Sequence, residues 1–225
     1  AYFARAVLWR KTAAVKSLQK LFKSKNFQAN ALDQLAIENR LPPAQVLHRI
    51  TNLLQKYFQV SKFVFMRVHP TASSIYHGMN IEARFTELDF LESEEFIENY
   101  CTLSNARKML YDPAYKDSEI QMQYAIMFVN QIEQPILQWT FASTDSANNT
   151  AITHNLILFI NEHMKQQLPF LNHIKAQPIQ MGLACQSCLL ANCPARVCEP
   201  YVVQKSARNK ALQKALEQLN TQHKS

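Results

Sequence analysis

The sequence contains only two glycines, Gly78 and Gly182. A phosphate-binding loop, a dinucleotide-binding fingerprint and the strained turn that presents a nucleophilic serine each need two or more closely spaced glycines. None of these motifs can be built here, which argues against most nucleotide-dependent enzymes. No nucleophile, base and orienting group can be assembled from the remaining residues either. We therefore expect a protein that is not an enzyme.

Long apolar runs are also missing. No stretch approaches the roughly 18 apolar residues that a membrane-spanning helix requires. The apolar fraction of 48% and the charged fraction of 18% are typical of globular proteins. With 225 residues the chain can form one domain of ordinary size with flanking elements. These features predict a soluble, cytoplasmic protein without a transmembrane segment.

Charge is distributed unevenly along the chain. Residues 1–40 contain eight Lys or Arg and two Asp or Glu, residues 41–164 contain eight and thirteen, and residues 165–225 contain eight and two. Two basic ends thus flank an acidic middle. Basic segments of this kind can contact nucleic acid, an anionic membrane surface or an acidic protein partner, or they can form solvated helix faces.

Hydrophobic periodicity predicts an α+β protein. Leu137, Trp139 and Phe141 should share one face of a strand, with Gln138 and Thr140 on the other. The predicted elements are a basic amphipathic helix at 4–23, two helices within 32–58, strands at 62–68 and 74–79, an acidic helix at 91–111, a hairpin of strands 124–129 and 136–142, a long helix at 150–167 and a last helix at 203–221.

Four of the five cysteines lie within fourteen residues, at Cys185, Cys188, Cys193 and Cys198, whereas Cys101 is far away in the sequence. The spacing C-x2-C-x4-C-x4-C lets one tight turn present the first pair while the chain folds back with the second pair. Four thiolates suit tetrahedral zinc, and closely spaced cysteines can also hold an iron–sulfur cluster. Two local disulfides or free thiols are the alternatives. We predict a structural or redox-sensing metal site, because four thiolates leave no open position for catalysis.

The spacing of these cysteines resembles that of the zinc knuckle family, which has histidine at the third ligand position, here Cys193. The likeness covers fourteen residues. Zinc knuckles usually carry an aromatic residue after the first cysteine and glycines within the loop, but this chain has Gln186, Leu189 and Asn192. Without the aromatic stacking platform, the resemblance implies a metal rather than binding to single-stranded RNA.

Residues 31–58 allow a helix-turn-helix interpretation. Leu35, Ala36, Leu41, Val46 and Ile50 occupy the packing positions of such a motif, although Arg40 stands where a turn glycine is usual. In this alternative the second helix would enter the major groove of DNA. The residues expected to face the groove are Gln45, His48, Arg49 and Asn52.

The same second helix also resembles the first helix of a GAF-like sensory domain. The helix from Gln45 to Phe58, the strand after it, the acidic helical middle, the hairpin and the helix at 150–167 follow the GAF order over about 125 residues. The resemblance implies a small-molecule, redox or protein-interaction module. The expected organisation is a basic helical extension at 1–42, a GAF-like α+β domain at 43–175, and a four-cysteine metal loop with a C-terminal helix at 176–225.

From these features we expect a regulatory or assembly protein that acts through protein contacts and carries zinc or an iron–sulfur cluster. A homo-oligomer is one possible form of such contacts. The alternative is a helix-turn-helix transcriptional regulator that binds nucleic acid and uses the metal site for structure.

Overall fold

The structure is a computed structural model that describes most of residues 9–182 and part of the segment after them. The described residues are 9–28, 30–70, 79–85, 101, 103–111, 119–129, 132–145, 150–182, 185, 188, 190, 192, 193, 195, 196, 200, 201, 205, 208, 209 and 211–213.

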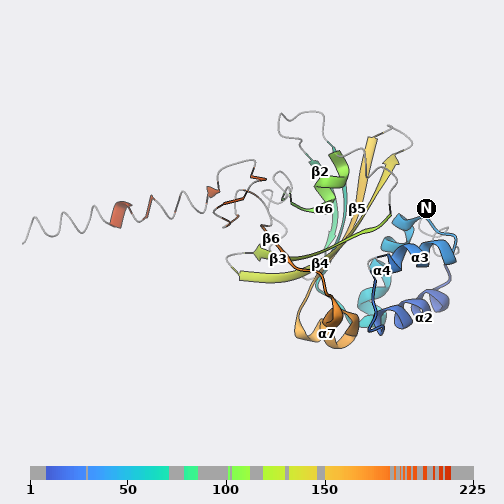
Figure 1. The fold of residues 1–225 in the computed structure, drawn as a ribbon. Coiled ribbons are helices and arrows are strands. Elements are labelled where there is room, and N and C mark those ends of the chain that lie inside the picture. Colours follow the sequence, from blue (N-terminus) through green and yellow to red (C-terminus); the bar gives the residue numbers. More distant parts are fainter. Residues whose placement is uncertain are drawn as a thin grey trace, which may run out of the picture.

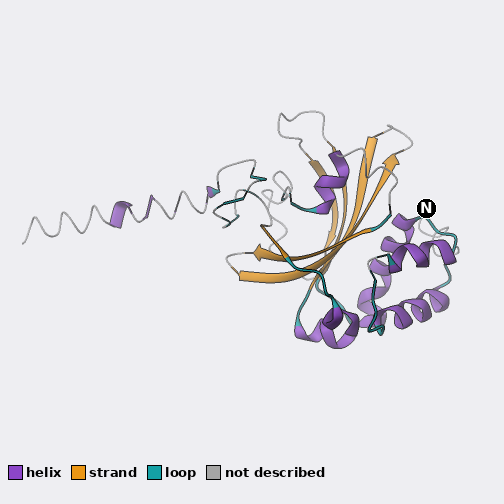
Figure 2. Ribbon diagram, in the orientation of Figure 1, coloured by secondary structure: helices purple, strands orange, loops and turns teal. Residues whose placement is uncertain are grey.

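A mixed sheet of six strands is the centre of the described fold (Figures 1 and 2). Its order is β2-β1-β5-β4-β3-β6, in which all neighbours are antiparallel except β3 and β6. The strands are β1 (Phe63–Pro70), β2 (Met79–Phe85), β3 (Gln121–Val129), β4 (Ile132–Asp145), β5 (Thr150–Phe159) and β6 (Ile179–Gly182).

One face of the sheet carries large apolar side chains and packs against helices. Trp139 is fully buried on this face, and Phe170 stacks on it with ring centroids 6.1 Å apart. The helices on this side are α2 (Lys11–Phe22), α3 (Ala31–Glu38), α4 (Pro43–Phe58), α7 (Glu162–Gln167) and the 3₁₀ helix η3 (Pro169–His173). One hydrophobic cluster therefore lies between these helices and the sheet, and in sequence its buried members extend from Trp9 to Leu171.

The helical pair α3 and α4 forms as its sequence predicts. Pro43 occupies the first turn of α4, where its missing N–H costs nothing. Arg40 lies in the turn between the helices with φ of 53°, in the left-handed region that glycine adopts most readily. The expected packing positions are all buried, namely Leu35, Ala36, Leu41, Val46 and Ile50.

The opposite face of the sheet buries a polar network beneath α6 (Asn105–Tyr111). Gln138 Nε2 donates to Asn155 Oδ1 at 3.1 Å, and Thr140 Oγ1 donates to the same oxygen at 2.8 Å. Ser104 Oγ lies 3.1 Å from Gln138 Oε1 and accepts from the backbone N–H of Ala106. The network thus fastens the beginning of α6 to the two central strands β4 and β5.

Three sequence predictions need correction. The long helix predicted at 150–167 is strand β5 followed by the short helix α7. Because β5 lies between β1 and β4, it is buried at almost every position from Ile152 onward, and its second half continues into the unbroken apolar run 156–160, which has no period that separates strand from buried helix. In the predicted helix 91–111 the described helix is α6 alone, and residues 91–100 lie outside the described part. The strand predicted at 74–79 overlaps β2 only at Met79, where β2 begins, and residues 74–78 lie outside the described part.

Other predictions agree with the structure. The basic helix forms as α2, the helices within 32–58 form as α3 and α4, and the predicted hairpin forms as β3 and β4. Described positions 201, 205, 208, 209 and 211–213 are helical, which agrees with the last helix as far as it is described.

Asp33 on α3 is hydrogen-bonded to Ile120, the residue directly before β3. Its Oδ1 atom accepts a hydrogen bond from the backbone N–H of Ile120 at 2.8 Å, and both residues are buried. Burial is the main reason why the pKa of Asp33 is raised above its ordinary value of 3.8, and the nearby Glu119 raises it too, against the lowering effect of the Ile120 hydrogen bond. The tether therefore has an electrostatic cost when Asp33 is ionised.

We expect Asp33→Asn to be at least as stable as the wild type at neutral pH. When an acidic group has a higher pKa in the folded protein than in the unfolded chain, the free energy of unfolding falls as pH rises from the unfolded-state pKa to the folded-state pKa. Above the folded-state pKa, the free energy of unfolding stays lower by the same amount. Asparagine keeps the acceptor for Ile120 but cannot ionise. Urea unfolding measured from about pH 3.5 to pH 7 should show this advantage growing as pH rises above the ordinary Asp33 pKa of 3.8.

Asp33→Leu is the matched control for this prediction. It removes the acceptor and leaves the buried N–H of Ile120 without its partner, which should cost about 1–3 kcal/mol. An Asp33→Asn variant that is clearly less stable than the wild type at pH 7 would contradict the account of this tether.

Candidate functional site

The predicted cysteine loop begins directly after β6, the strand at one edge of the sheet. Cys185 and Cys188 are buried at 6% and 5% exposure, and a turn joins them in which the N–H of Cys188 donates to the carbonyl of Cys185 at 3.4 Å. Cys193 is half-buried, and a second turn follows it in which Arg196 N–H donates to its carbonyl. Cys198 lies outside the described residues. Two turns thus present the described cysteines.

Cys101, which is far from the loop in the sequence, lies close to it in the structure. Burial is the main reason why the pKa of its thiol is raised to about 11, and Cys185 and Cys188 are near enough to raise it as well. Hydrogen bonds to its sulfur from the backbone of Leu103 and Gly182 lower this pKa. Sequence reasoning missed this neighbour, because the only signal was that Cys101 is a cysteine.

Arg196 fastens the loop and supplies positive charge beside a sulfur. Its guanidinium donates to the carbonyl oxygen of Leu190. Burial raises the pKa of Cys188, whereas the backbone of Leu190 and the guanidinium of Arg196 lower it; Cys193 and Cys185 act in the raising direction. The net result is a pKa of Cys188 above its ordinary value, so Arg196 and the backbone of Leu190 offset only part of the effect of burial, which disfavours the thiolate that binds metals.

The described cysteines have suitable donor atoms for a metal but do not form a complete site. Cys101, Cys185, Cys188 and Cys193 are free thiols rather than disulfides. Among the described residues, no three His, Cys, Asp or Glu side chains are arranged so that they could hold a metal ion. The fourth predicted ligand, Cys198, is not among them. The four-cysteine site therefore stays a prediction.

The helix face predicted to read DNA lies partly against the sheet. Gln45, His48, Arg49 and Asn52 are all half-buried. The His48 ring packs edge-on against Phe65 of β1 with centroids 5.5 Å apart, and Asn52 Nδ2 lies 3.1 Å from His48 Nδ1. Helix α4 therefore packs against the sheet through part of this face. The role of these four residues in binding nucleic acid stays a prediction.

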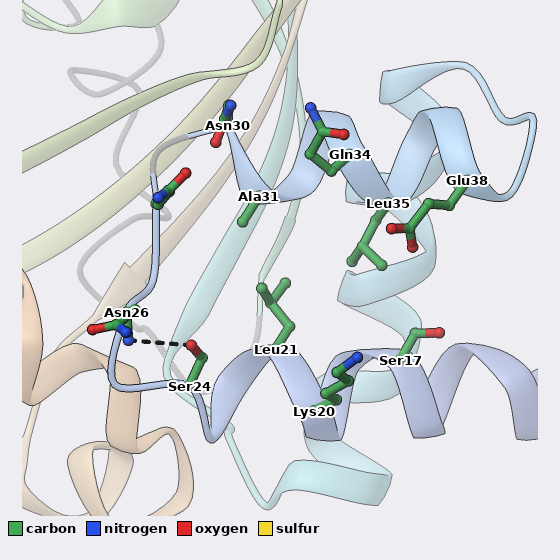
Figure 3. A pocket seen from close by; sticks show the side chains of 11 residues that line it. Ser17, Lys20, Leu21, Ser24, Asn26, Asn30, Ala31, Gln34, Leu35 and Glu38 are labelled. Atoms are coloured by element: carbon green, nitrogen blue, oxygen red, sulfur yellow. Dashed lines mark hydrogen bonds between the residues drawn. The ribbon is translucent and has the colours of Figure 1, made fainter.

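A cleft of about 410 Å³ separates α2 from α3 (Figure 3). Leu21, Ala31 and Leu35 form its apolar part, and the rest of the lining is polar. The polar lining consists of Ser17, Lys20, Ser24, Asn26, Gln28, Asn30, Gln34 and Glu38. Hydroxyl and amide groups dominate this cleft, so it offers mainly uncharged hydrogen-bonding groups beside one lysine.

Among known proteins, a likeness is found in solved structures. No family model matches the chain, and no curated protein matches it. A solved structure described as a Mycobacterium tuberculosis transcriptional regulator is similar, with a TM-score of 0.54 and 17% sequence identity. The match covers 89% of this chain and 56% of that one, so this chain spans little more than half the length of the regulator. At this identity the likeness concerns the fold.

The helices were also compared with the requirements of a membrane span. Within the described part of the chain, no helix combines the length and the apolar character needed to cross a bilayer.

Proposed function

We propose that the protein is a non-enzymatic regulatory or assembly protein whose cysteine loop holds zinc, or alternatively an iron–sulfur cluster. The GAF-like domain would respond to the presence or absence of metal in this loop, or to a small ligand, and would transmit this response through contacts with other proteins. A protein partner or a second copy of the chain would read the change.

The observation that supports this proposal most is the burial of Cys185 and Cys188 beside Cys101. A loop that lay on the surface without packing against the domain would leave its thiols exposed to solvent. Here the loop follows β6 in the chain, and its buried cysteines lie near Cys101, which precedes the turn that leads into α6. Occupation of the loop by a metal would therefore affect the position of structural elements of the sheet domain.

The fold likeness to a transcriptional regulator supports the regulatory part of the proposal. It also keeps the nucleic-acid alternative open, because that protein is described as a regulator of transcription. For this chain, the half-buried side of α4 makes a protein or ligand response the better-supported form of regulation.

The test combines metal analysis with hydrogen exchange. Cys188→Ser and Cys193→Ser should each lower the metal bound per chain about tenfold or more, because each removes one of the four predicted thiolate ligands. In the same variants, amide exchange should rise at β6 and at the start of α6. Cys101→Ser is the matched control, which removes a buried thiol outside the loop and should retain the metal.

Two results would count against the proposed function. One is unchanged metal content after loss of Cys188 and Cys193. The other is a wild-type protein in which removal of the metal with a chelator leaves hydrogen exchange at β6 and α6 as it was.

A further inference from the structure

The first 32 residues contain seven Lys or Arg and no Asp or Glu. The first acidic residue is Asp33, which is buried and accepts a hydrogen bond from Ile120. Helix α2 consequently has no acid of its own with which its lysines could form the ion pairs that are common on solvated helices. The positive charge of α2 is therefore not neutralised by acidic residues within the helix.

Lys16 and Lys20 of α2 share one side with Lys23, which directly follows the helix, whereas Lys11 at the start of α2 lies over the ring of Tyr57. Ala14, Leu18 and Phe22 are buried against the core. At 100° per residue, Lys16, Lys20 and Lys23 fall within about 60° of one another on the opposite side, and all three are exposed. Lys25 follows immediately and is exposed too. The packing of α2 therefore turns a row of ammonium groups outward.

The length of this row fits a nucleic-acid strand. Lys16 and Lys23 are about 10 Å apart along the helix axis, at 1.5 Å per residue. Successive phosphates on one strand of duplex DNA rise about 3.4 Å each along the duplex axis, so a row of this length can reach more than one phosphate of the same strand.

The cleft between α2 and α3 adds neutral hydrogen-bonding groups next to the row. Lys20 belongs to both, and the lining residues around it include Ser17, Ser24, Asn26 and Asn30 (Figure 3). Serine, asparagine and glutamine commonly join lysine in binding phosphate and sugar. Glu38 is the one acid among the lining residues of this cleft.

We infer that the outward face of α2, defined by Lys16, Lys20 and Lys23, together with the adjoining cleft, is a docking surface for the phosphate backbone of a nucleic acid. Binding is to the backbone and does not depend on base sequence. This surface is separate from the α4 face, whose four predicted residues are half-buried. It goes beyond the metal-linked regulation proposed above, since α2 belongs to the helical side of the sheet and the cysteine loop follows the edge strand β6.

Fluorescence anisotropy with a labelled duplex DNA of mixed sequence tests this inference. The triple variant Lys16→Gln, Lys20→Gln, Lys23→Gln should bind at least about tenfold more weakly at about 50 mM salt. The slope of the logarithm of affinity against the logarithm of salt concentration should become shallower by about 2.7, which is about 0.9 for each phosphate that a lysine no longer neutralises. The substituted side chains point away from the core, so the thermal unfolding midpoint should stay unchanged.

The control removes three exposed lysines elsewhere, by Lys62→Gln, Lys108→Gln and Lys175→Gln on segments outside α2 and α3. It should retain both the affinity and the salt slope. Equal losses of affinity in the two triple variants would show that net charge alone drives binding and would overturn the inference. A polyglutamate peptide bound by the wild type more tightly than the DNA would also overturn it, in favour of an acidic protein partner.

Discussion

Phe170→Ala should lower the free energy of unfolding by about 3–5 kcal/mol. Phe170 is fully buried and stacks on Phe27 with centroids 4.3 Å apart, on Phe22 at 5.5 Å and on Trp139 at 6.1 Å. It therefore fills the space between α2, the segment after α2 and the sheet. Alanine would leave a cavity lined by three aromatic rings, which cannot all move inward to fill it.

Urea unfolding followed by circular dichroism measures this effect, and His173→Ala is the control within the same 3₁₀ helix. His173 is exposed, so its truncation should change stability by less than about 0.5 kcal/mol. A Phe170→Ala variant that loses less than about 1.5 kcal/mol would mean that the helical side does not pack on the sheet as described.

Gln138→Met should destabilise the protein by about 2–4 kcal/mol, although methionine has nearly the same length and is more apolar. Gln138 is completely buried and bonds to Ser104, Thr140 and Asn155. The thioether can replace neither the donor nor the acceptor. Buried hydroxyl and amide groups would then be left without hydrogen-bond partners, which costs more than the added apolar packing returns.

Gln180→Met makes the same chemical change on the exposed side of edge strand β6 and should be close to neutral. Hydrogen exchange adds a local measurement, because loss of the network should increase exchange at the start of α6, where Ser104 caps the helix. Equal stability of the Gln138 and Gln180 variants would refute the structural role assigned to the network.

The elements that sequence alone predicts well are those with a single buried face. Helix α4 has a clear apolar stripe and a proline at its start, and in β4 Trp139 and Phe141 alternate with Gln138 and Thr140. Strand β5 reads as a helix in the sequence because both of its faces are buried and its periodicity is lost. The alternation in β4 suggests that Gln138 and Thr140 face solvent, but both side chains are buried under α6.

The candidate site is accessible to sequence analysis only in part. Cysteine spacing marks Cys185, Cys188 and Cys193 because they are close together in the chain. Cys101 cannot be connected to them from sequence, since it reaches the loop only after the sheet has placed β6 beside β3. The lysine row of α2 is visible as a basic helix, but its outward orientation depends on which side of α2 packs against the core.

Metal analysis of the freshly purified wild-type protein tests the central claim most directly. Elemental analysis should find about one zinc per chain with a colourless solution, or iron and sulfide with a brown absorption band near roughly 400 nm, and the metal should disappear in the Cys188→Ser variant. Protein that contains neither metal after purification, and that binds neither zinc nor iron and sulfide when these are added under reducing conditions, would contradict the account.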